Sequence, residues 1–169
     1  MSVIEHKQKR NENINVAVLT ISDTRTKETD KSGRLMCELL KKDEFLVQHY
    51  EIVRDEQVEI ETILLEHIQN PKIDAILTNG GTGLSNRDVT FNVVEQIIEK
   101  PILGFGELFR MLSFEEIGSA SMLSRAIAGV VKQTVIFSTP GSTGAVKLAM
   151  EKLILPELIH IVNEIKKDN

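Results

Sequence analysis

The chain has 169 residues, of which 41% are hydrophobic and 27% charged, and its formal net charge is −5 at pH 7. These values are ordinary for a globular protein with its own core and exclude disordered and fibrous classes. The negative charge argues against a nucleic-acid partner, and no apolar run approaches the roughly 18 residues that a membrane span needs.

The beginning of the chain is polar and charged. We expect residues 1–13 to form a flexible arm and residues 14–169 to form a single domain. Cys37 is the only cysteine, which excludes an intramolecular disulfide and a multi-cysteine zinc site. We therefore expect a cytoplasmic protein without a membrane anchor.

Two strand–helix units are predicted first. The apolar, β-branched run at 14–22 predicts a strand buried on both faces, and leucine and methionine then recur at helical spacing from 35 to 42. Residues 45–53 predict a second strand. Apolar residues at helical spacing from 60 to 68 predict the next helix, which ends at Asn70-Pro71.

The second half of the chain is less regular. A strand at 73–78 runs into a glycine cluster, and a helix over 93–98 ends before Pro101. Gly104 and Gly106 precede a short helical pattern around 108–112, and residues 126–137 predict a hairpin or strand pair broken at 132–133. A long helix opened by the segment 140–144 is expected to be kinked or interrupted at Pro156.

The alternation of strands and helices predicts a parallel sheet covered by helices on both faces, because the crossover connections are right-handed. Ligands bind such sheets at the carboxyl ends of the strands. The fold class is therefore α/β, a three-layer α/β/α sandwich with a mostly parallel central sheet.

The glycine cluster Gly80-Gly81-Thr82-Gly83 directly follows a predicted strand. Backbone amides there can approach an anion without a Cβ in the way, which predicts a phosphate or pterin cradle. The alternative is a tight turn without a ligand. The segment is neither a Walker A loop nor a dinucleotide fingerprint.

Several polar residues admit both a structural and a functional role. Asp88 is either a first-turn acid of the next helix or a Mg²⁺ ligand. Asp55 is a solvated acid at a helix start if taken alone. Ser22, Asp23 and Ser142 are turn or helix caps, or ligand contacts.

Four motifs, taken in order along the chain, resemble those of molybdopterin-binding proteins of the MoaB/Mog family, and most closely the MoaB branch. They are Gly80–Gly83 with Arg87–Thr90, Gly104–Glu107 with Arg110, Ser124–Ala126, and Pro140–Ser142. The resemblance extends from Val16 to Leu158 and implies the three-layer fold, a pterin site at the strand ends, and homotrimers or homohexamers.

The resemblance also implies a reaction. Members of the Mog type adenylylate molybdopterin with Mg-ATP before metal insertion, and their two catalytic acids match Asp55 and Asp88, which are also the implied Mg²⁺ ligands. Some MoaB proteins depart from the Arg-Asp pair that this chain keeps. The implied substrate-binding residues are Ser22, Asp23, Gly80, Gly81, Thr82, Gly83, Arg87, Gly106, Glu107, Ser124, Arg125, Pro140, Gly141 and Ser142.

The implied partners are molybdopterin, ATP and a molybdenum-insertion protein. The alternative function is that of a non-catalytic molybdopterin carrier or scaffold, which keeps the pterin pocket without turning over ATP.

Overall fold

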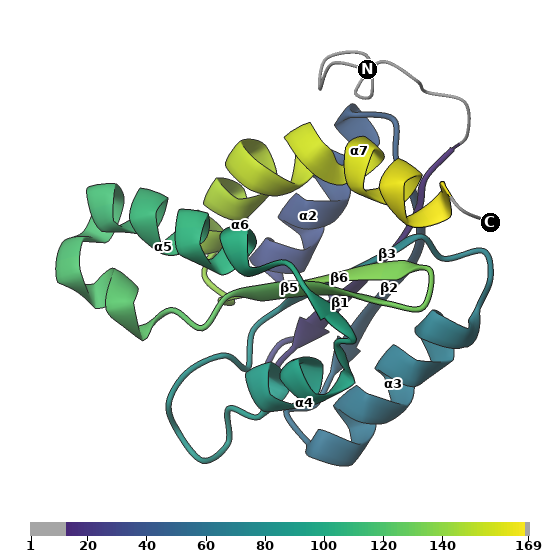
Figure 1. Ribbon diagram of the computed structural model, residues 1–169. Coiled ribbons are helices and arrows are strands. Elements are labelled where there is room, and N and C mark those ends of the chain that lie inside the picture. The colour runs from purple at the N-terminus through teal and green to yellow at the C-terminus, as the bar shows by residue number, and fades with distance from the viewer. Residues whose placement is uncertain (1–12, 168–169) are drawn as a thin grey trace.

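The structure, a computed structural model, describes residues 13–167, so all of the predicted arm except Asn13 lies outside the described residues (Figure 1). A six-stranded sheet has the order β2-β1-β3-β6-β5-β4. Its strands are β1 (Asn15–Ile21), β2 (Leu46–Val53), β3 (Ala75–Asn79), β4 (Lys100–Pro101), β5 (Ile127–Val131) and β6 (Thr134–Thr139). The strands β2, β1, β3 and β6 run parallel, and β5 and β4 continue the sheet antiparallel.

Helices cover both faces of the sheet. They are α2 (Lys31–Lys42), α3 (Gln57–Gln69), α4 (Thr90–Ile97), α5 (Leu103–Ile117), the short 3₁₀ helix η1 (Gly118–Leu123), α6 (Thr143–Ala149), the π-helical η2 (Met150–Ile154) and α7 (Leu155–Lys166). Within residues 13–167, no helix combines the length and apolarity that crossing a bilayer demands.

Alternate residues of β1 serve two separate cores. Val16 and Val18 pack in the cluster that includes residues of α2, α5, α6 and α7, whereas Ala17 and Leu19 pack in the cluster that includes residues of α3 and α4. Because successive side chains of a strand point to opposite faces, this pattern requires helices on both sides. The predicted three-layer sandwich is confirmed, and Figure 1 shows the two helical layers.

The predicted hairpin at 126–137 is confirmed as β5 and β6, joined by Lys132 and Gln133. Four helices, α2, α3, α4 and α5, begin before the apolar positions that predicted them. α2 starts at Lys31, because the Asp30 carboxylate accepts a hydrogen bond from Gly33 N and caps the helix before its first apolar residue. α5 starts at Leu103, so Gly104 lies inside the helix rather than before it.

The irregularity predicted at Pro156 is present as a widened turn. The π-helical segment η2 joins α6 to α7 and ends two residues before Pro156. Proline has no N–H and cannot supply the i→i−4 hydrogen bond of a regular helix, which is a common reason for local rearrangement of the ladder.

A buried histidine makes the stability of the fold depend on pH. His67 of α3 is 2% exposed, and its ring centroid lies 4.8 Å from that of His49. Burial lowers the pKa of His67, and the charge of His49 lowers it further, against the opposing effect of Glu51, whose Oε1 lies 3.4 Å from His67 Nε2. The folded protein therefore holds fewer protons at this ring than the unfolded chain does.

We expect the free energy of unfolding to be highest above pH 6.5, the ordinary histidine pKa, and to fall as the pH drops from 6.5 towards the lower pKa of folded His67, because only the unfolded chain gains a proton in that window. Urea unfolding at pH 7.5, 6.5 and 5.5 should show this loss. The His67→Gln variant should lose part of the pH dependence, whereas His160→Gln, on the surface of α7, should keep it. Equal slopes in wild type and His67→Gln would show that His67 does not carry the effect.

Candidate functional site

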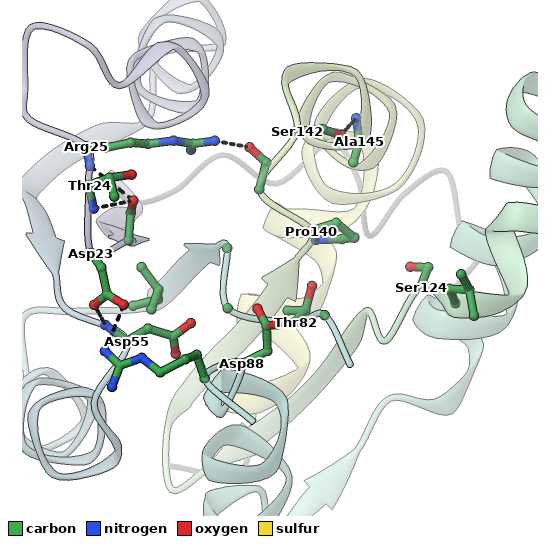
Figure 2. A pocket seen from close by; sticks show the side chains of 18 of the residues that line it. Asp23, Thr24, Arg25, Asp55, Thr82, Asp88, Ser124, Pro140, Ser142 and Ala145 are labelled. Atoms are coloured by element: carbon green, nitrogen blue, oxygen red, sulfur yellow. Dashed lines mark hydrogen bonds and ion pairs between the residues drawn. The ribbon is translucent and has the colours of Figure 1, made fainter. Parts of the chain in front are cut away.

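The main cavity of the described structure lies at the carboxyl ends of β1, β3 and β6 and has a volume of about 640 Å³. This is the end of a parallel sheet where ligands bind, and the volume lies within the usual range for small-molecule sites. Its walls come from the segments after these three strands, from Asp55 at the end of β2, and from α5 and η1 (Figure 2).

Most residues of the sequence-predicted site line this cavity. They are Ser22, Asp23, Asp55, Gly80, Gly81, Thr82, Gly83, Arg87, Asp88, Ser124, Pro140, Gly141 and Ser142. Three predicted residues do not. Gly106 lines a separate cavity of about 330 Å³, Glu107 is exposed on α5, and Arg125 turns its guanidinium to the backbone beside the cavity.

The position of Gly106 has a packing explanation. A Cβ there would lie 2.8 Å from the carbonyl oxygen of Ala126, so the glycine allows α5 to pack closely against the segment that leads into β5. This glycine therefore serves the packing of α5 rather than the main cavity.

The glycine turn after β3 is strained in a way that only glycine accepts easily. Gly80 has a φ of 96° and Gly81 a φ of 65°. Gly80 N donates to the carbonyl oxygen of Thr139, which ties the turn to the end of β6. Within residues 13–167, the next three N–H groups, of Gly81, Thr82 and Gly83, donate no hydrogen bond to the protein. Successive free N–H groups in a glycine turn form an anion-binding concavity.

Acidic groups lie on one side of this turn. The nearly buried carboxylate of Asp55 accepts a hydrogen bond from Val89 N, and the backbone N–H of Asp55 donates to Asp23 Oδ1 at 3.0 Å. Burial raises the pKa of the Asp55 carboxyl, and the charges of Asp88 and Asp23 raise it further. Figure 2 shows Asp55 and Asp88 on the same side of the cavity as Thr82. This is a place where a cation would relieve repulsion between carboxylates.

Arg87 is the exposed cation of the site. Its guanidinium donates at 2.8 Å to Asp23 Oδ2 and at 2.8 Å to Glu56 Oε1. The hydrogen bond from Arg87 lowers the pKa of Asp23. Because 60% of the Arg87 side chain is exposed, these ion pairs are screened by water, and the guanidinium can exchange them for an anion in the cavity.

A second arginine, which sequence reasoning missed, ties two walls of the cavity together. Arg25 follows β1, and its Nη2 donates to the carbonyl oxygen of Gly141 at 2.9 Å. In Figure 2 a dashed line leads from the labelled Arg25 to this bond. Ser32 Oγ donates to the same oxygen at 2.7 Å. Arg25 Nη1 lies 3.5 Å from Oδ1 of the buried Asp30. The contact between Arg25 and Gly141 spans 116 residues, so no local pattern predicts it.

The α5–η1 wall was also missed. Phe109, Ser113 and Ile117 line the cavity at the i, i+4, i+8 spacing of one helix face, and Ala120 and Leu123 continue the wall into η1. That spacing is visible in the sequence, but the prediction ended the helical pattern near residue 112. A longer helix would have revealed this wall.

Two turn residues keep their structural roles in addition to lining the cavity. Ser22 Oγ accepts hydrogen bonds from the backbone N–H groups of Thr24 and Arg25. Ser142 Oγ accepts one from Ala145 N and caps α6. Both cap predictions are confirmed, while the ligand contacts predicted for these two residues stay predictions.

Comparison with known proteins identifies close relatives over almost the whole chain. Residues 17–160 match the family model described as a probable molybdopterin binding domain. Molybdenum cofactor biosynthesis protein B of Bacillus subtilis is 53% identical over 169 residues, covering 99% of both chains. A crystal structure of molybdenum cofactor biosynthesis protein B superposes with a TM-score of 0.90 and 53% identity, covering 92% of this chain and 98% of that one. The tungsten cofactor synthesizing protein MoaB from Pyrococcus furiosus has a TM-score of 0.83 and 36% identity over 92% of this chain and 98% of its own.

Proposed function

Because the chain belongs to the family of molybdopterin binding domains, we propose that it acts in molybdenum cofactor biosynthesis by binding molybdopterin in the main cavity and adenylylating it with Mg-ATP. The product would pass to a molybdenum-insertion protein. The observation that carries the proposal is the row of free N–H groups at Gly81, Thr82 and Gly83, which faces a cavity that is also lined by the carboxylates of Asp55 and Asp88.

The reaction joins two phosphates. An oxygen of the molybdopterin phosphate attacks the α-phosphorus of ATP, a new P–O bond forms, and the bond to the departing pyrophosphate breaks. The glycine turn holds a phosphate by its N–H groups, and Arg87 offers a positive charge that compensates the anions brought together. Fixing the two reactants side by side is the main contribution that the protein makes.

The residues present fit a magnesium ion that arrives with ATP. Among residues 13–167, no group of three or more histidine, cysteine or acidic side chains is arranged to hold a metal by itself. Magnesium is commonly held by one or two carboxylates together with substrate phosphates. Asp55 and Asp88 supply such a pair, and the ion would offset charge on the phosphates.

The test is direct. Purified protein is incubated with molybdopterin and Mg-ATP, and the products are separated and examined for adenylylated pterin and pyrophosphate. Formation of both supports the enzyme. Tight molybdopterin binding without either product would overturn the adenylylation and leave the carrier function. Absence of molybdopterin binding would overturn the proposal as a whole.

We also propose that the protein is a homo-oligomer, a trimer or a hexamer. Large apolar side chains are exposed along α5 and η1, namely Leu103, Leu108, Met111, Phe114, Ile117, Met122 and Leu123. Figure 1 shows α5 and η1 extending beyond the sheet at one side of the molecule. A concentrated apolar face of this kind is typical of surfaces covered by another subunit.

Light scattering at micromolar concentration should therefore give a mass at least three times the 19.0 kDa of the chain. A double change of Met111→Asp and Phe114→Asp should lower that mass, because it buries two charges in the contact. Val58→Asp is the matched control, since Val58 is 74% exposed on α3, away from this face. A wild-type mass of 19 kDa at all concentrations would contradict the prediction.

A further inference from the structure

Arg125, between η1 and β5, connects to the loop of residues 82–89 that joins the glycine turn to α4. Its Nε donates to the carbonyl oxygen of Thr82 at 3.1 Å. Its Nη2 donates to the carbonyl oxygens of Gly83 at 2.7 Å and Asp88 at 3.3 Å. One side chain thus joins the first residues of the 82–89 loop to its end.

The same guanidinium is held from the other side by α4. Arg125 Nη1 donates to Asn92 Oδ1 at 3.1 Å, and the guanidinium carbon lies 4.8 Å from the ring centroid of Phe91. Arginine has five N–H donors in a fixed plane, and four of them are engaged in these contacts. Stacking on an aromatic ring fixes the plane itself. The guanidinium therefore has only one N–H donor left for a ligand.

From this geometry we propose that Arg125 is a positioning residue that holds the 82–89 loop in its binding shape and does not itself touch the substrate. The inference rests on the proposed function of the loop. With the loop in this shape, the N–H groups of Thr82 and Gly83 and the carboxylate of Asp88 line the main cavity. If the two ends of the loop separate, these groups no longer converge.

The other ties of the 82–89 loop are single backbone hydrogen bonds at its base, local contacts or exposed ion pairs. At the base, Thr90 N donates to the carbonyl oxygen of Gly81 at 3.0 Å, and Val89 N donates to Asp55 Oδ1 at 3.3 Å. Asp88 Oδ2 accepts hydrogen bonds from Ser85 N and Ser85 Oγ, which shape the tip of the loop but do not anchor it. The ion pairs of Arg87 are exposed and screened. Arg125 is partly buried and contacts carbonyl groups at both ends of the loop, so it provides the larger share of the anchoring.

The test uses hydrogen–deuterium exchange in the ligand-free protein, alongside molybdopterin binding. The reporters are the hydrogen-bonded amides of Ser85, Asp88 and Val89. In Arg125→Ala these amides should exchange about tenfold faster or more. Opening of the 82–89 loop in the variant no longer requires breaking the charge-assisted hydrogen bonds that Arg125 makes in wild type. Arg125→Lys should restore little of the protection, since an ammonium cannot span both loop ends.

Arg34→Ala is the matched control: it removes the same charge from an exposed position of α2 and should leave exchange and molybdopterin binding unchanged. Arg125→Ala should weaken molybdopterin binding in parallel with the faster exchange. Weakened binding with unchanged exchange in a folded Arg125→Ala variant would overturn the inference and make Arg125 a direct contact. Failure of the wild type to bind molybdopterin would instead overturn the proposed function and leave the exchange result as a separate measurement.

Discussion

An Asp88→Asn variant should bind molybdopterin and stay folded, yet adenylylate it about 100-fold or more slowly than wild type, the size of effect seen when a preorganised electrostatic group is lost. Asp88 Oδ2 accepts the hydrogen bonds from Ser85, so an amide oxygen can replace it in the turn. What the substitution removes is the charge that would hold Mg²⁺ with Asp55.

A Ser85→Ala variant provides the complementary control. It removes the hydroxyl that donates to Asp88 Oδ2 at 2.5 Å and leaves the carboxylate charge in place. Single-turnover rates with Mg-ATP should fall strongly in Asp88→Asn and only modestly in Ser85→Ala. Equal loss in the two variants, or full activity in Asp88→Asn, would make Asp88 a structural cap of the turn and leave the chemistry to other groups.

The Gly81→Val variant should lose molybdopterin binding by about 100-fold or more, which corresponds to roughly 2.7 kcal/mol. A Cβ at this position would lie 2.0 Å from Thr90 Oγ1 and 3.0 Å from both carboxylate oxygens of Asp55. The φ of 65° adds a conformational cost of about 1–2 kcal/mol for a residue with a Cβ. The turn must therefore move, and its free N–H groups with it.

Binding titrations and circular dichroism on the same samples separate loss of the cradle from loss of the fold. Gly144→Ala is the matched control, because no atom lies within 4 Å of its added Cβ and alanine is favoured in a helix. The Gly81→Ala change combined with Thr90→Ala removes the oxygen with the closest contact and should recover part of the binding. A folded Gly81→Val variant with wild-type affinity would contradict the cradle.

The sheet could be predicted from sequence because local runs of apolar residues identify its central strands. Val16 to Ile21 and Ala75 to Asn79 are short apolar or β-branched runs, and burial on both faces leaves no other place for them. The glycine turn was predictable for a related reason. Positive φ at Gly80 and Gly81 favours glycine, and the sequence has glycine at both positions.

The parts that were missed depend on contacts between distant segments. In the sequence Arg25 is one polar residue of a loop, and only the fold places it beside Gly141. Arg125 is a substrate-binding candidate in the sequence, but in the structure its guanidinium donates to the backbone carbonyl oxygens of Thr82 and Asp88. The α5–η1 wall was missed because the predicted helical pattern ended near residue 112, whereas α5 continues to Ile117. Propensity is a weak predictor when tertiary packing opposes it.

The strand order also governs how the chain is built during synthesis. β6, although it is the last strand in sequence, lies between β3 and β5 and supplies Pro140 and Gly141 at its end. Until residue 139 has emerged from the ribosome, β3 presents an unpaired edge of N–H and C=O groups that can recruit other strands. The cavity at this end of the sheet therefore cannot form on a nascent chain that has reached only the glycine turn, and chaperone binding to stalled chains of about that length would be expected to decline once β6 is released.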